Sequence, residues 1–397
     1  MQKLTLTHLT EACTAGGASV LVSTTELAPA AGPLTGVAPA RYLTGKTPTY
    51  VYETRYLDGQ PVQTVLIDSK ASSLNRIEEQ VSRAIADGNP VLGRTPRITV
   101  NYAGHPPLAD YDLPHRAFDG HLQAGTLDGQ PTTQHPTYRA LRDANAANAR
   151  LLLETAPSCL PLGGWDSKRQ ANQTRFRSAV TGEVIGVLAD QSANAERNPK
   201  RGGSRVDPLA PGVHLRSADA TALLECMRDT MSPKTVGDIE KESKRGAVRG
   251  SRFGLGHIAP SLDGLGQVAC SRIVRSFTVS FAALRQLRFD TTPEGNAACR
   301  ALLAAWAING MVRAQSELLL RANCDLVELD EPALWLDARY GRRIDLETPS
   351  IEAADALLLE AIEQAGELAG IRWEGQVLTI EGNPAVMLSA SAEVEDE

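Results

Sequence analysis

Residues 49–57, TYVYETRYL, and residues 62–68, VQTVLID, flank the dipeptide Asp58-Gly59, and this stretch decides how the chain folds. Both segments are rich in β-branched and aromatic side chains, which favour extended strands. Asp58-Gly59 is typical of a tight turn, because both residues tolerate positive φ angles. The pattern predicts an antiparallel β-hairpin.

A helix is expected directly after the hairpin. Apolar side chains recur there at the spacing of one helix face, at Leu74, Ile77, Val81 and Ile85. Ser72 or Ser73 is expected to cap the N-terminus of this helix, and Gly88 to end it.

The same reasoning predicts strands and helices along the rest of the chain. Strands are expected at residues 19–27, 97–102, 180–189, 272–281, 324–329 and 376–380. Helices are expected at residues 138–155, 293–321 and 351–369. Because the two kinds of element are mixed throughout, the expected fold class is α+β, with helices packed on a mainly antiparallel sheet. Residues 190–261 show little periodicity, so a long loop without secondary structure is expected there.

Charge is unevenly distributed along the chain. Residues 325–397 carry 18 acidic and 4 basic side chains, whereas residues 1–324 carry 29 acidic and 36 basic ones. Arginine outnumbers lysine by 32 to 8. The planar guanidinium suits bidentate phosphate contacts, although a GC-rich genome produces the same excess of arginine.

The sequence lacks the signatures of several classes of protein. The N-terminal residues have no uninterrupted apolar stretch typical of a signal peptide, and no run of about 18 apolar residues occurs, so a soluble, cytoplasmic protein without membrane contact is expected. The six cysteines are widely spaced, which favours buried thiols over a zinc or redox site. Residues 254–259 match a dinucleotide fingerprint but follow no strand, and no Gly-x-Ser-x-Gly elbow occurs. We expect no cofactor.

One cluster has the chemistry of metal ligands. It consists of His105, Asp110, Asp112, His115, Asp119 and His121. Imidazoles and carboxylates can hold a divalent ion for hydrolysis, but this spacing fits no standard site and also suits a polar loop with a helix start. A metal-dependent nuclease acting on RNA or DNA through His105, Asp110, His115 and Asp119 therefore stays open as the alternative function.

Basic residues concentrate between residues 165 and 290. The first group contains Lys168, Arg169, Arg175, Arg177, Arg197, Lys200, Arg201 and Arg205, and the second contains Lys241, Lys244, Arg245, Arg249 and Arg252. Glycines among them let the backbone approach phosphates, and Trp165, Phe176 and Phe253 offer faces on which bases stack. Contact with RNA or single-stranded DNA is the favoured interpretation, and solvated surface loops are the competing one.

An ordered set of short motifs carries a family resemblance. The motifs are residues 64–69 (TVLIDS) leading to 75–79 (NRIEE), 114–119 (PHRAFD), 163–167 (GGWDS), 203–208 (GSRVDP), 256–261 (GHIAPS) and 284–289 (LRQLRF). Together they resemble the backbone subunit of type I-G CRISPR surveillance (Cascade) complexes, formerly type I-U. This is the Csb-one or Cas-seven-u family of the repeat-associated RNA-binding (RAMP) superfamily. His257 stands where this family more often has Asn.

The resemblance implies a modified ferredoxin-like, RRM-like palm with an inserted thumb and finger loops. It places this palm at residues 1–330, with insertions at about residues 105–135 and 190–261. Residues 331–390 would add an acidic helix–strand element to the same domain. Residues 391–397 are too acidic and too poor in apolar residues to fold, so a disordered tail is expected there from composition.

The resemblance also implies a non-catalytic function. Copies would oligomerise along one CRISPR RNA (crRNA), hold its sugar-phosphate backbone, contact the large subunit and the subunits at the crRNA ends, and present the spacer to target DNA. Asp68 and Asp166 are the nearest candidates for a cleaving acid, and both are interpreted as structural. A protein-only scaffold is a further, weaker alternative.

The expected RNA-binding residues combine the basic segments with one helix start. They are Ser69, Asn75, Arg76, Trp165, Lys168, Arg169, Arg175, Lys200, Arg201, Arg205, Lys244, Arg245, Arg249, Arg252 and His257. Ser69, Asn75 and Arg76 sit around the start of the first long helix, where free N–H groups and the helix dipole favour a phosphate. Plain helix capping is the alternative for these three residues.

Overall fold

The computed structural model describes residues 1–171, 173–205, 214–255, 258–261 and 264–391. The chain forms two compact units. The first consists of Met1–Tyr42, Tyr50–Arg197 and Val268–Asn383, and the second of Leu43–Thr49, Asn198–Gln267 and Pro384–Glu397.

The predicted hairpin is confirmed and lies at one edge of the main sheet. Strand β5 (Tyr52–Leu57) pairs antiparallel with β6 (Gln60–Asp68) across a turn in which Asp58 and Gly59 have φ angles of 50° and 76°. The sheet order is β1-β21-β20-β2-β18-β13-β6-β5. The other strands are β1 (Gln2–Lys3), β21 (Arg343–Glu347), β20 (Ala333–Asp337), β2 (Val20–Pro29), β18 (Cys270–Ser280) and β13 (Val180–Leu188), and β19 (Leu326–Glu328) also pairs with β2. The ladders are antiparallel except between β1 and β21, as the expected α+β class requires.

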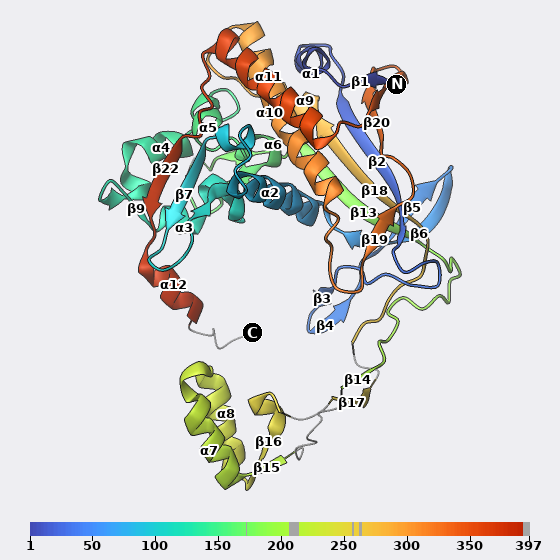
Figure 1. Ribbon diagram of the computed structural model, residues 1–397, viewed down its shortest axis with the longest axis vertical. Helices are drawn as coiled ribbons and strands as arrows, with labels where there is room; N and C mark the ends of the chain where they lie inside the picture. The colour runs from blue at the N-terminus through green and yellow to red at the C-terminus, as the bar shows by residue number, and fades with distance from the viewer. Residues whose placement is uncertain (172, 206–213, 256–257, 262–263, 392–397) are drawn as a thin grey trace. The chain divides into compact units, whose positions relative to one another are not determined.

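Helices of the first unit pack around one central helix (Figure 1). Helix α10 (Pro293–Ser316) is buried on nearly every side, and it contacts α1 (Leu6–Cys13), α2 (Lys70–Ala86) and α11 (Ile351–Ala369). Short helix α9 (Phe281–Leu284) follows β18. The sequence predicted both ends of α11, whereas α10 ends at Ser316, five residues before the expected end at residue 321.

A second sheet joins the middle of the chain to its C-terminal part. Its order is β10-β9-β22-β7-β8, and β22 pairs parallel with β7. The strands are β10 (Gln130–Pro131), β9 (Thr126–Leu127), β22 (Val377–Glu381), β7 (Arg97–Asn101) and β8 (Leu108–Ala109). The acidic C-terminal segment thus supplies the central strand of this sheet.

Short helices fill the segment between α2 and β13. They are η1 (Leu92–Arg94), η2 (Asp110–Asp112), η3 (Arg116–Phe118), α3 (Gly120–Gln123), η4 (Thr132–Gln134), α4 (Pro136–Arg142), α5 (Arg150–Thr155) and α6 (Cys159–Leu162). The single helix predicted for residues 138–155 is wrong, because α4 ends at Arg142 and α5 begins only at Arg150. In between, Asn145 and Asn148 pair through their own backbone groups, and the amide of Ala147 donates to the Asn145 side chain.

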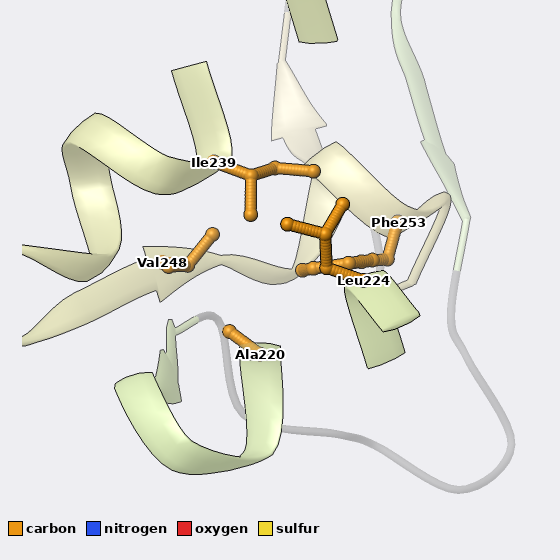
Figure 2. Close-up of a cluster of buried hydrophobic side chains, with 5 residues drawn as sticks. All are labelled: Ala220, Leu224, Ile239, Val248 and Phe253. Atoms are coloured by element: carbon orange, nitrogen blue, oxygen red, sulfur yellow. The ribbon is translucent and has the colours of Figure 1, made fainter. Parts of the chain in front are cut away.

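The second unit contradicts the expectation of a long unstructured loop. It contains helices α7 (Ser217–Met227) and α8 (Pro233–Ser243), with η5 (Arg228–Thr230), η6 (Gly250–Phe253) and the paired strands β15 (His214–Arg216) and β16 (Ala247–Arg249). Five buried apolar side chains form their core, namely Ala220, Leu224, Ile239, Val248 and Phe253 (Figure 2). We call residues 214–255 the α7–α8 lobe. Polar residues and glycines separate its few core residues along the sequence, so the helical periodicity of apolar side chains is weak there.

The remaining elements of the second unit are short. They are the hairpin of β3 (Tyr42–Thr44) and β4 (Thr47–Thr49), the pair β14 (Gly203–Arg205) and β17 (Ile258–Ser261), and helix α12 (Pro384–Ser391). Most of the predicted disordered tail, residues 392–397, lies outside the described residues. None of the described helices is long and apolar enough to cross a membrane.

The cysteine prediction is confirmed for four thiols and wrong for one. Cys13, Cys159, Cys299 and Cys324 are buried, and Cys270 is half-buried. Cys226 is exposed because it lies on the polar face of α7.

A buried carboxylate joins β6, α2 and the segment after α10. Asp68 is 1% exposed and accepts hydrogen bonds from Ser72, Arg76 and Arg321. Ser69, and not Ser72 or Ser73, caps α2, and the hydroxyls of Ser72 and Ser73, which lie inside the helix, both donate to Asp68. The buried charge therefore connects the first turn of α2 to the end of β6.

We predict that Asp68→Ala destabilises the protein by about 3–5 kcal/mol, because two half-buried guanidinium groups lose a fully buried counter-charge. Urea unfolding followed by circular dichroism measures the change. Glu79→Gln is the matched control: it removes a surface ion pair to Arg83 on the same helix and should cost less than about 1 kcal/mol. Equal effects of the two variants would contradict the role of Asp68.

Candidate nucleic-acid interface

An exposed aromatic side chain with an arginine over its ring lies on a short hairpin of the first unit. Trp165 is 47% exposed and ends β11 (Gly164–Trp165), which pairs with β12 (Arg175–Phe176) so that Trp165 lies opposite Arg175. The guanidinium carbon of Arg175 is 5.2 Å from the centre of the indole ring. This is cation–π geometry, with the guanidinium over the ring, and about half of Trp165 stays in contact with solvent. We call this pair the Trp165 platform.

Buried contacts fix the residue that follows Trp165. Asp166 is 1% exposed, and its carboxylate lies 2.7 Å from Nη2 of Arg142. Gln123 also donates to it, at 3.3 Å. An ion pair buried to this degree holds one geometry, so the backbone at the platform is rigid.

The two glycines before Trp165 are equally constrained. Gly163 has a φ angle of 91°, and its carbonyl accepts a hydrogen bond from Nη1 of Arg116 at 3.0 Å. A Cβ on Gly164 would lie only 2.9 Å from the ring of Phe118. Only glycine fits this close approach without a shift of the neighbouring ring. Arg116 also pairs with the buried carboxylate of Glu78 on α2, which links the platform to that helix.

The cations beside the platform divide into two kinds. Lys168, Arg175 and Arg177 are exposed. Arg169 is held within the fold, because it donates to the backbone carbonyl of Arg142 and pairs with Asp143. Arg175 thus lies over the indole ring, and the exposed Lys168 and Arg177 lie within three residues of Trp165 and Arg175 along the chain, a combination of cations and an aromatic face that suits single-stranded nucleic acid.

The three expected residues around the start of α2 have different roles in the structure. Ser69 is the N-cap and accepts from the amide of Ser72 at 3.3 Å. Arg76 donates through Nε, Nη1 and Nη2 to Asp68, Leu319 and Ser72, so its guanidinium is engaged inside the fold. Asn75 is exposed and lines a surface hollow of about 690 Å³ between α2 and residues 111–114. Of these three side chains, Asn75 is the one best placed to meet a ligand.

The expected residues of the second unit also differ in their surroundings. Lys200, Arg201, Lys244 and Arg245 are exposed. Arg249 and Arg252 both pair with Glu242, and hydrogen bonds from Arg249 lower the pKa of this carboxyl to about 2. The side chain of Arg205 and all of His257 lie outside the described part of the chain.

The six residues of the alternative metal cluster do not converge. Asp110 accepts from the amide of Ile98 and the hydroxyl of Ser158, and Asp112 accepts from the amide of Ala109. Asp119 caps α3 by accepting from the amide of His121, and it also accepts from the amide of His115 in the preceding turn. The residues that the structure describes contain no group of three or more His, Cys, Asp or Glu side chains able to hold a metal ion. In the structure, these three carboxylates cap and brace backbone turns.

Sequence reasoning missed the side chains that hold the platform. Arg116, Gln123 and Arg142 are far in sequence from Trp165, and although Arg116 lies in the motif of residues 114–119, no local pattern marks their contacts. Arg116 has a φ angle of 50°, which is unusual for a residue other than glycine. Backbone strain of this kind is visible only in the folded chain.

Part of the chain is similar to a known family. Residues 21–191 match the family model described as CRISPR-associated protein GSU0053. No curated protein matches the chain. The matched residues include the β5–β6 hairpin, α2 and the Trp165 platform, so this candidate interface lies in a segment similar to a CRISPR-associated family. The match supports a role in CRISPR defence.

The fully buried carboxyl of Asp110 predicts a pH dependence of stability. Burial raises its pKa from 3.8 to about 6, so the folded state keeps the proton to higher pH than the unfolded chain does. Its stabilising contribution is complete below about pH 4 and is lost as the pH rises to about 6. The two pKa values correspond to a loss of about 3 kcal/mol.

We therefore predict that Asp110→Asn, which cannot ionise, gains stability relative to the unmodified protein as the pH rises from 4 to 6. Urea midpoints at several pH values measure this difference. Asp325→Asn, at an exposed position, controls for the loss of one negative charge. A difference in stability between the variant and the unmodified protein that does not change from pH 4 to 6 would show that Asp110 is ionised over this whole range.

Proposed function

We propose that this chain is a non-catalytic backbone subunit of a type I-G CRISPR surveillance complex, several copies of which bind along one crRNA. The observation that carries the proposal is the exposed Trp165 platform within the segment that matches a CRISPR-associated family. The ordered motifs of residues 64–289 support the finer assignment to this subunit. The partners would be crRNA, further copies of the chain, the large subunit, the subunits at the crRNA ends and target DNA.

The chemistry of the platform suits a guide of any sequence. The indole face of Trp165 can stack on any base, because every base has a π face. Lys168 and Arg177 are exposed within three residues of Trp165 and Arg175 along the chain and can neutralise phosphates without reading base edges. A backbone subunit has to accept every spacer, so contacts of these two kinds are the ones it needs.

Two buried carboxylates support the non-catalytic part of the proposal. Asp68 and Asp166, the nearest candidates for a cleaving acid, are each 1% exposed. Asp68 pairs with Arg76 and Arg321, and Asp166 pairs with Arg142. Carboxylates enclosed in this way act as counter-charges within the fold.

Charge distribution supports assembly from several copies. The basic residues 1–324 and the acidic residues 325–397 carry net charges of opposite sign. Opposite charges on one chain attract the complementary parts of a second copy and steer their association.

We predict that Trp165→Ala weakens crRNA binding by about 1–3 kcal/mol and that Trp165→Phe restores most of the loss, because stacking needs an aromatic face. Filter binding at several salt concentrations gives the affinity. Its log–log salt slope, roughly −3 to −4 for four to six phosphate contacts, should not change in Trp165→Ala but should become shallower in Lys168→Gln with Arg177→Gln.

Tyr56→Ala is the matched control, because it removes an exposed aromatic side chain from edge strand β5. Sequencing of RNA bound to the purified protein supplies the second test. Repeat-derived RNA of uniform length supports the proposal. A salt slope near zero, or equal losses in Trp165→Ala and Tyr56→Ala, would refute it.

A further inference from the structure

Helix α8 of the α7–α8 lobe has one face fixed by packing. Ile239 is 1% exposed and points into the cluster with Leu224, Val248 and Phe253 (Figure 2). Val236, one turn earlier, packs against the same cluster. The opposite face of the helix is therefore turned to solvent.

The acidic side chains of α8 are neutralised by arginines from other elements of the lobe. Glu240 pairs with Arg228 at 3.0 Å, and Asp238 pairs with Arg252 at 3.1 Å. Glu242 pairs with Arg252 and with Arg249. The sequence suggested one basic cluster at residues 241–252. Arg249 and Arg252 of that cluster balance acids of the helix, so they differ from its remaining cations.

Four cations are left on the outer side of α8 and directly after its C-terminal end. Lys234, Lys241, Lys244 and Arg245 are all exposed, and none of them forms an ion pair with a residue that the structure describes. Lys234 and Lys241 are seven residues apart, so they lie within roughly 20° of one line along the helix. Lys244, the C-cap of α8, and Arg245 follow the last helical residue and extend the array at the C-terminal end. We call these four residues the α8 basic face.

The α8 basic face lacks a stacking surface. Residues 233–245, PKTVGDIEKESKR, contain no aromatic side chain. Sites for single strands combine cations with aromatic rings on which the bases stack, as at the Trp165 platform. A double helix hides its base faces and presents regularly spaced phosphates, for which compact lysine charges are sufficient.

We propose that the α8 basic face binds the phosphate backbone of double-stranded DNA without regard to sequence. The choice of DNA as the polymer rests on the proposed function, since a guide-bearing complex has to hold duplex DNA before the guide can pair with one strand. The α8 basic face then acts separately from the guide-binding Trp165 platform, and it raises the local concentration of target duplex.

The test compares two full-length quadruple variants that lose the same charge. The face variant carries Lys234→Gln, Lys241→Gln, Lys244→Gln and Arg245→Gln. The control variant carries Lys3→Gln, Arg288→Gln, Arg342→Gln and Arg372→Gln, all at exposed positions outside the lobe. Glutamine keeps the helix propensity of α8, and circular dichroism checks the fold. A third variant replaces the three lysines by Arg and Arg245 by Lys, which keeps the charge.

Binding of a duplex DNA of unrelated sequence is measured over a range of salt concentrations, and crRNA binding is measured in parallel. We expect the face variant to lose duplex affinity by about tenfold or more and its log–log salt slope to become shallower by about 3–4. The control and the charge-keeping variant should retain most of the duplex affinity, and all three variants should retain crRNA binding.

Equal duplex affinity of the face and control variants would overturn the inference. So would a loss of crRNA binding as large as the loss of duplex binding, because the face would then serve the guide. Failure of the unmodified protein to bind crRNA would refute the proposed function alone, since the duplex comparison between the two quadruple variants does not depend on a guide.

Discussion

The buried carboxylate of Asp68 is the constraint on which the first unit depends. It lies at the last residue of β6, one residue before the N-cap of α2, and it pairs with guanidinium groups from α2 and from the segment after α10. Arg321 also donates to the backbone carbonyls of Ala38 and Ile67. A charge buried in this way is tolerated only when its partners are in place, so sheet, helix and connecting segment become one cooperative structure.

A second ion pair transmits this rigidity to the surface. Glu78 lies on α2 two residues after Arg76, and its pair with Arg116 reaches the carbonyl of Gly163 beside the Trp165 platform. Asp166 and Arg142 fix the other side of Trp165. A stacking surface that is already ordered loses little conformational entropy on binding, so more of the stacking free energy is available for affinity.

Local patterns in the sequence predicted much of the secondary structure but few of the side-chain roles. The β5–β6 hairpin, the long strand β18 and helix α11 follow from periodicity and turn residues within each segment. The break between α4 and α5 depends on the turn that Asn145 and Asn148 close, and the α7–α8 lobe depends on a core of only five buried residues. Because few residues produce either feature, neither gives a clear pattern of apolar spacing in the sequence.

The candidate interfaces show why amino-acid composition alone does not predict which cations are exposed. Arginine supplies nearly all the ion pairs of the described residues, and many of its partners are distant in sequence, as Asp68 is from Arg321. An excess of arginine therefore indicates internal pairing as much as phosphate contact. Only the folded chain shows that Arg76 and Arg252 are paired with acids, whereas Arg175 and Arg245 are exposed without an ion pair among the described residues.

The two surfaces that remain differ in the chemistry of their exposed groups. The Trp165 platform combines an aromatic face with cations inside the segment that matches a CRISPR-associated family, whereas the α8 basic face carries cations alone and lies after residue 191, where that match ends. A base that must be displayed needs a stacking partner, and a duplex that is only held does not. The two proposed tasks lie on separate segments, so a substitution in one surface leaves the side chains of the other unchanged.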